Sequence, residues 1–87
     1  PVGWVIRQRQ PRKHVALELG NSTPVIVEPD ADLETAARKL AASGFTHAGQ
    51  SCISVQRVYV HRDVHDRFAE LFVAAVEDLV VGDPMDE

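Results

Sequence analysis

The sequence has 87 residues, of which 45% are hydrophobic and 25% are charged, and its formal net charge is −4. These values are typical of a globular protein and exclude a disordered or fibrous one. The length allows one small domain with a thin core. No apolar run approaches the about 20 residues that a membrane span needs, and no signal peptide opens the sequence. We therefore expect a soluble protein with no membrane partner.

The placement of cysteine, methionine and charge narrows the class of protein further. Cys52 is the only cysteine, so no internal disulfide can form and a reducing, cytoplasmic environment is expected. The sequence starts at Pro1 and has its only methionine at Met85, which indicates a piece of a longer protein. Residues 1–14 are basic, but no aromatic ladder or basic helix face accompanies them, so nucleic acid is not an expected partner.

The first third of the sequence predicts a helix followed by two short strands. Residues 2–9 suit the end of a helix, and Pro11 breaks it because proline lacks a backbone donor. Residues 15–19 are mostly apolar and suit a buried strand, and residues 25–27 are all β-branched and suit a second one. A turn at residues 20–24 separates these strands. Two apolar strands so close together need cover on both faces.

A helix with a face of small side chains is predicted next. Asp30 or Asp32 is its N-cap, it runs to about Ser43, and Gly44 is its stop. Its apolar face has helical spacing and consists of Leu33, Ala36, Ala37, Leu40 and Ala41. The glycine-containing residues 45–53 that follow are not predicted to be a regular helix.

The last third of the sequence predicts a strand and the strongest helix. Residues 56–61 alternate as a strand, Asp63 caps the helix, and residues 82–84 end it. The apolar face of this helix consists of Val64, Phe68, Leu71, Phe72, Ala75, Val76 and Leu79. The order of elements is that of an α/β protein with a mainly parallel sheet, although 87 residues are too few for a complete doubly wound domain.

Glu18 and Cys52 are the candidate catalytic pair. Glu18 interrupts an apolar run, and Cys52 follows a glycine by three residues. A thiol nucleophile and a carboxylate base are the groups that covalent catalysis on a carbonyl carbon needs. Each residue also has an ordinary structural interpretation: Glu18 as an outward strand residue or a partner of Arg57, and Cys52 as a small buried hydrophobe.

The four histidines favour no metal site. His61 and His65 flank the cap of the last helix, and no third ligand has the spacing to join them. His47 is close to Cys52 in sequence and is interpreted as a polar helix residue. Trp4 and the stripe of Phe68 and its neighbours are interpreted as packing residues.

Six short segments indicate a protein family more specifically than single residues do. They are residues 15–20 (VALELG), 22–27 (STPVIV), 30–33 (DADL), 48–52 (AGQSC), 57–60 (RVYV) and 81–84 (VGDP). In this order and spacing they resemble landmarks of the NAD(P)-dependent aldehyde dehydrogenases. The resemblance implies a partial three-layer α/β/α catalytic domain with short, mostly parallel strands and two main amphipathic helices. It also implies an aldehyde substrate, NAD or NADP as cofactor, and a homo-oligomer.

The resemblance assigns roles to four residues. Cys52 attacks the aldehyde carbon, giving a thiohemiacetal that passes hydride to the nicotinamide and becomes a thioester. Glu18 activates the water that hydrolyses this thioester. The backbone N–H of Cys52 is one oxyanion donor. Leu19 and Gly20 match positions where the backbone lies against the nicotinamide.

Two departures from the family's pattern set limits to the resemblance. Asn21 stands where the family usually has a second glycine, and asparagine tolerates a left-handed backbone. The nucleotide loop survives at most as Val2 and Gly3, and the oxyanion asparagine and ribose-binding glutamate have no counterpart. Residues 1–14 are then the end of a nucleotide-binding domain with its connecting loop, and residues 15–87 are part of the catalytic domain. Acting alone, the 87 residues are expected to be inactive.

Two other hypotheses remain open from the sequence. A non-catalytic module that self-associates through unpaired strands would explain the apolar segments without chemistry. A redox thiol protein would need an intermolecular disulfide, because Cys52 has no second cysteine to resolve it.

Overall fold

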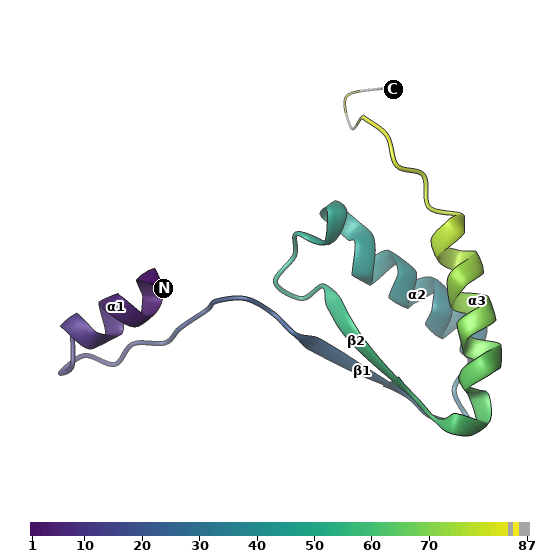
Figure 1. Cartoon of the computed structure of the whole chain (residues 1–87), viewed down its shortest axis with the longest axis horizontal. Coiled ribbons are helices and arrows are strands. Elements are labelled where there is room, and N and C mark those ends of the chain that lie inside the picture. The colour runs from purple at the N-terminus through teal and green to yellow at the C-terminus, as the bar shows by residue number, and fades with distance from the viewer. Residues whose placement is uncertain (84, 86–87) are drawn as a thin grey trace.

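The computed structural model describes residues 1–83 and 85. The elements, in chain order, are α1 (Val2–Arg9), β1 (Thr23–Val27), α2 (Leu33–Phe45), the 3₁₀ turn η1 (Thr46–Gly49), β2 (Val55–Val60), the 3₁₀ turn η2 (Arg62–Val64) and α3 (His65–Glu77). Figure 1 shows α2 and α3 beside the two strands, with α1 at the far end of an extended segment.

The central unit is a parallel pair of strands joined through a helix. β1 and β2 pair in parallel, with Val25 opposite Val58 and Val27 opposite Val60. Parallel strands cannot be joined by a tight turn, and here the connection contains α2. This arrangement confirms the predicted α/β class, its parallel strands and its two main helices.

A small core lies between the strands and the two longer helices. Its buried members are Val27, Ala37, Leu40 and Phe68. Phe68 stacks on Phe72 with 5.7 Å between ring centroids, and both belong to the core with Leu71, as predicted, whereas Leu79 of the predicted face is exposed beyond the end of α3. Ala37 has almost no exposed surface, which lets α2 pack closely on the strands. These contacts cover one face of the sheet.

The opposite face of the sheet is open among the described residues. Ile26 and Tyr59 lie opposite each other there and are 68% and 53% exposed. The whole structure exposes 7481 Å², whereas a compact monomer of this mass exposes about 5,100 Å². Its radius of gyration is 17.9 Å, against roughly 12 Å for a compact domain of this length. The structure is therefore part of a layered α/β arrangement with one layer uncovered.

The prediction of a strand at residues 15–19 is wrong. Residues 12–22 form no helix or strand. A strand exists only where its backbone pairs with a neighbour, and this segment has no paired neighbour in the described structure. Apolar composition identified an extended segment correctly but could not supply its partner.

Three predicted helix boundaries are also wrong. α2 runs through Gly44 to Phe45, and η1 follows it directly. Asp63 does not cap α3; it lies inside η2, where the His61 ring nitrogen accepts a hydrogen bond from its backbone N–H at 3.3 Å. α3 ends at Glu77, before Gly82. Pro84, predicted as part of that stop, lies outside the described residues.

Asp32, one of the two predicted caps, is the N-cap of α2. Its carboxylate accepts a hydrogen bond from the Thr35 backbone N–H at 3.1 Å. That hydrogen bond lowers the pKa of Asp32 below its ordinary value. A lowered pKa in the folded state adds stability above the unfolded pKa, and this contribution is lost as the pH falls through the folded pKa.

We predict that Asp32→Asn reduces the loss of stability in acid. Asparagine caps a helix without titrating, so the variant keeps the cap at every pH. Between about pH 6 and about pH 3 the melting temperature of the natural chain should fall further than that of the variant. Circular dichroism melts of both chains measure the difference. Equal losses would contradict a contribution from Asp32.

Candidate active site

The starts of β1 and β2 bring the two candidate segments together. Because the strands are parallel and adjacent, the residues that enter them lie at the same edge of the sheet. Residues 19–21 enter β1 there, and residues 49–52 precede β2. Together they form a hollow of about 390 Å³, here called the Cys52 hollow. Its lining consists of Leu19, Gly20, Asn21, Gly49, Gln50, Ser51, Cys52 and Gln56.

Cys52 lies on a tight turn between Ser51 and Ser54. The Ser54 backbone N–H donates to the Ser51 carbonyl at 3.0 Å, and the Ile53 N–H donates to the Ser51 hydroxyl at 3.4 Å. Ser54 has no exposed surface, and its hydroxyl donates to the Gly44 carbonyl of α2 at 3.0 Å. The turn is therefore attached to the core on its C-terminal side.

Cys52 is exposed, and its backbone N–H has no hydrogen-bond partner among the described residues. Cys52 is an exposed free cysteine, so its interpretation as a small buried hydrophobe is wrong. No hydrogen bond joins the Cys52 N–H to any residue that the structure describes. A thiol nucleophile and an uncommitted backbone donor thus occur on one residue that lines the Cys52 hollow.

The chain reaches this turn through a left-handed backbone. His47 and Ala48 have φ of 53° and 54°, and Gly49 has φ of 76°. Left-handed angles strain residues with a Cβ and suit glycine. The chain thereby reverses between α2 and the Cys52 turn. His47 is exposed in this 3₁₀ turn, and its carbonyl accepts from the Gln50 N–H at 3.0 Å.

Asn21 connects the two segments of the hollow. Its side-chain Nδ2 donates to the Ser51 carbonyl at 2.8 Å, across 30 positions of sequence. Its Oδ1 accepts from the Thr23 N–H at 3.4 Å. Asn21 does not adopt a left-handed backbone. It contributes to the site through the hydrogen bonds of its side chain. The sequence marked this position only as a departure from a glycine.

Glu18 lies beside the hollow and is not part of its lining. It is exposed, and Leu17 and Leu19 on either side of it both approach Gly3 of α1. In an extended segment the residue between two such neighbours points the other way. Arg57 does not pair with Glu18: its guanidinium donates to the Ser22 carbonyl at 2.9 Å. The structure thus brings Leu19, Gly20 and Cys52 together and leaves Glu18 at the margin.

Gly20, which lines the Cys52 hollow, has open space at its Cβ position. A Cβ built on Gly20 would meet no atom within 4 Å, so its backbone is uncovered on that side. A flat ring can therefore approach Leu19 and Gly20 next to Cys52. This open lining fits the nicotinamide end of a dinucleotide.

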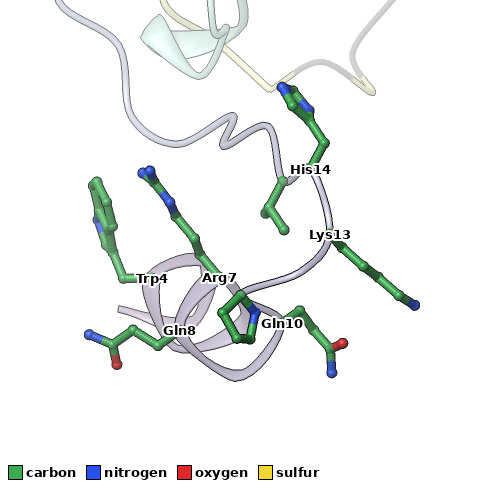
Figure 2. Close-up of a pocket in the computed structure, with 8 residues that line it drawn as sticks. Trp4, Arg7, Gln8, Gln10, Lys13 and His14 are labelled. Carbon is green, nitrogen blue, oxygen red and sulfur yellow. The ribbon is translucent and has the colours of Figure 1, made fainter.

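A second hollow lies around α1 and is separate from the thiol. Figure 2 shows Trp4, Arg7, Lys13 and His14 around it. Arg7 lies over the Trp4 ring at 5.7 Å, and Trp4 is half exposed. No group of three metal-ligating side chains occurs in residues 1–83 and 85, and none of the helices described there is long and apolar enough to cross a membrane.

Comparison with known proteins gives one consistent family. The model of the aldehyde dehydrogenase family matches residues 1–87. A 3-sulfolactaldehyde dehydrogenase of Priestia aryabhattai is 49% identical over 86 residues, which is 99% of this chain and 18% of the relative. A succinate-semialdehyde dehydrogenase [NADP(+)] of Mycobacterium leprae is 47% identical over 74 residues, which is 85% of this chain and 16% of the relative.

The solved structures agree with the sequence relatives. An NAD-dependent benzaldehyde dehydrogenase from Corynebacterium glutamicum superposes with a TM-score of 0.82 at 46% identity. The superposition covers 99% of this chain and 18% of the crystallised one. The chain thus spans less than a fifth of the length of the relatives that it matches.

Proposed function

Because the chain belongs to the aldehyde dehydrogenase family, we propose that it carries the nucleophile and the general base of an NAD(P)-dependent aldehyde dehydrogenase. The observation that carries this proposal is the Cys52 turn. Its thiol is exposed, its N–H is free, and uncovered backbone at Leu19 and Gly20 lies beside it. An exposed thiol with an adjacent backbone donor suits attack on a carbonyl carbon.

Cys52 forms the covalent intermediates. Its thiolate bonds to the aldehyde carbon, and the carbonyl oxygen becomes an oxyanion that the Cys52 N–H binds. When the carbon–oxygen double bond re-forms, the carbon loses its hydride and a thioester remains on Cys52. Bound NAD(P)+ supplies the acceptor for that hydride. Leu19 and Gly20 would hold the nicotinamide end against the hollow.

Glu18 acts in the second half of the reaction. It takes a proton from a water molecule as the water oxygen bonds to the thioester carbon. The Cys52 thiolate leaves, and the product is a carboxylic acid. Glu18 is exposed and directly precedes Leu19 of the lining in sequence, which supports this role. The proton goes to Glu18 and then to solvent.

The rest of the assignment concerns the whole protein. Residues 1–14 would end its nucleotide-binding domain, and residues 15–87 would be part of its catalytic domain. The open face at Ile26 and Tyr59 supports further layers or subunits, in keeping with a homo-oligomer. The single free cysteine supports a reducing, cytoplasmic location. The substrate class is an aldehyde.

A segment exchange tests this proposal. Residues 1–87 replace the matched segment of the Corynebacterium glutamicum benzaldehyde dehydrogenase, giving an enzyme here called the exchanged enzyme. We expect it to form NADH from NAD+ and benzaldehyde, and we expect residues 1–87 alone to form none, because the cofactor site is incomplete in them. NADH absorbance measures both. An exchanged enzyme that folds and binds NAD+ but forms no NADH would overturn the proposal.

A further inference from the structure

We propose that Asn21 is a positioning residue that fixes the peptide plane between Ser51 and Cys52. This inference rests on the proposed function and concerns a residue outside the predicted catalytic pair. Asn21 is the only side chain described here that reaches the Ser51 carbonyl from another segment of the chain.

The two hydrogen bonds of Asn21 define the orientation of its amide. Nδ2 faces a carbonyl, which can only accept, and Oδ1 faces the Thr23 N–H, which can only donate. A flipped amide would place two acceptors against each other at Ser51. The amide is therefore held at both ends, and the 2.8 Å contact to Ser51 is the shorter of the two.

The Ser51 carbonyl belongs to the same peptide unit as the Cys52 N–H. A trans peptide is planar, so the carbonyl and the N–H point in opposite directions. The Ser51 carbonyl accepts both from Asn21 and from the Ser54 N–H. Held in this way, it cannot rotate toward the substrate, and the Cys52 N–H remains turned away from both donors.

The same contact strengthens the Cys52 N–H as a donor. A hydrogen bond to a carbonyl polarises its peptide unit and makes the N–H of that unit a better donor. In the proposed reaction this N–H binds the oxyanion, so Asn21 acts on the transition state through the peptide plane and touches no reacting atom. Asn21 also lines the Cys52 hollow beside Leu19 and Gly20. It thus connects the cofactor side of the hollow to the nucleophile side.

Asn21→Asp isolates this contact. The variant keeps an oxygen for the Thr23 N–H and replaces the donor to Ser51 with a second acceptor. Loss of one neutral hydrogen bond corresponds to roughly a three- to tenfold effect. In the exchanged enzyme we expect kcat/KM for the aldehyde to fall by about that factor or more, with the dissociation constant of NAD+ unchanged. If kcat/KM and the affinity for NAD+ both fell by similar factors, Asn21 would have a general structural role and the proposal would be wrong.

Two further variants distinguish the positioning effect of Asn21 from effects of added charge and of altered folding. Asn21→Gly removes the donor without adding charge, and we expect a loss similar to that of Asn21→Asp. Ser22→Ala, which leaves both hydrogen bonds of Asn21 in place, is the matched control and should behave as the parent. If Asn21→Gly has the activity of the parent, the loss in Asn21→Asp comes from charge and the proposal is wrong.

Amide exchange in the 87-residue chain gives a readout that needs no activity. The Ser54 N–H shares the Ser51 carbonyl with Asn21, whereas the His61 N–H bonds to Val27 in the sheet at 3.0 Å. In Asn21→Gly we expect the Ser54 amide to exchange roughly three to ten times faster while the His61 amide keeps its rate. Unchanged exchange at Ser54 would overturn the proposal, whereas a Cys52→Ser enzyme that stays active would overturn the proposed function alone.

Discussion

Replacing Cys52 with serine should lower kcat/KM of the exchanged enzyme by roughly a thousandfold or more, about 4 kcal/mol of transition-state free energy. A serine hydroxyl ionises far less readily than a thiol, and no residue lining the Cys52 hollow is a strong base that would compensate. Initial rates of NADH formation measure the loss, and mass spectrometry of the quenched enzyme should show no acyl adduct on residues 51–54.

Ser51→Ala is the matched control for this change. It alters the neighbouring residue, removes only the hydroxyl that accepts from the Ile53 N–H, and leaves the thiol and its peptide plane in place. We expect an effect of tenfold or less from it. If Cys52→Ser retained activity within tenfold of the parent, Cys52 would not be the nucleophile.

The local structure was predictable where periodicity and capping decide it. The face from Leu33 to Ala41 predicted α2, and Asp32 caps that helix through Thr35. The β-branched run ending at Val27 predicted β1. The helix depends on interactions within a few residues of sequence, whereas β1 also needs its pairing with β2.

Boundaries set by tertiary contacts were not predictable. Gly44 was read as a helix stop, but its carbonyl accepts from the Ser54 hydroxyl ten positions later, and the helix continues past it. Residues 15–19 have strand composition without a paired neighbour in the described structure. Asp63 was predicted to cap α3, but the turn η2 precedes this helix, and His61 caps η2 through its ring nitrogen.

The candidate site was partly predictable for a different reason. Cys52 and Glu18 stood out as single residues of reactive type, and the resemblance gave their roles. Asn21 and Ser54 did not stand out, because their hydrogen bonds join positions 30 and 10 residues away. Only the parallel pairing of β1 and β2 brings Asn21 beside Ser51. The reactive residue types were visible in the sequence, whereas the hydrogen bonds that support the Cys52 turn were not.

Glu18→Gln should slow hydrolysis of the thioester and leave its formation largely intact. Removal of a general base costs about 10²- to 10⁴-fold, so kcat should fall by that factor. Because deacylation then limits turnover, the first turnover should appear as a burst of NADH of about one equivalent per active site. Stopped-flow absorbance measures the burst, and mass spectrometry should find the acyl group on Cys52.

Two additions make this experiment decisive for Glu18. Hydroxylamine attacks thioesters without help from a base, so it should restore turnover in Glu18→Gln and have little effect on the parent. Glu28→Gln removes another exposed carboxylate, at the opposite end of β1, and should leave kcat unchanged. Since Glu18 lies at the margin of the hollow, the burst tests whether its carboxylate reaches the thioester. A low kcat without a burst would instead place Glu18 in the first half of the reaction, where it would deprotonate the thiol.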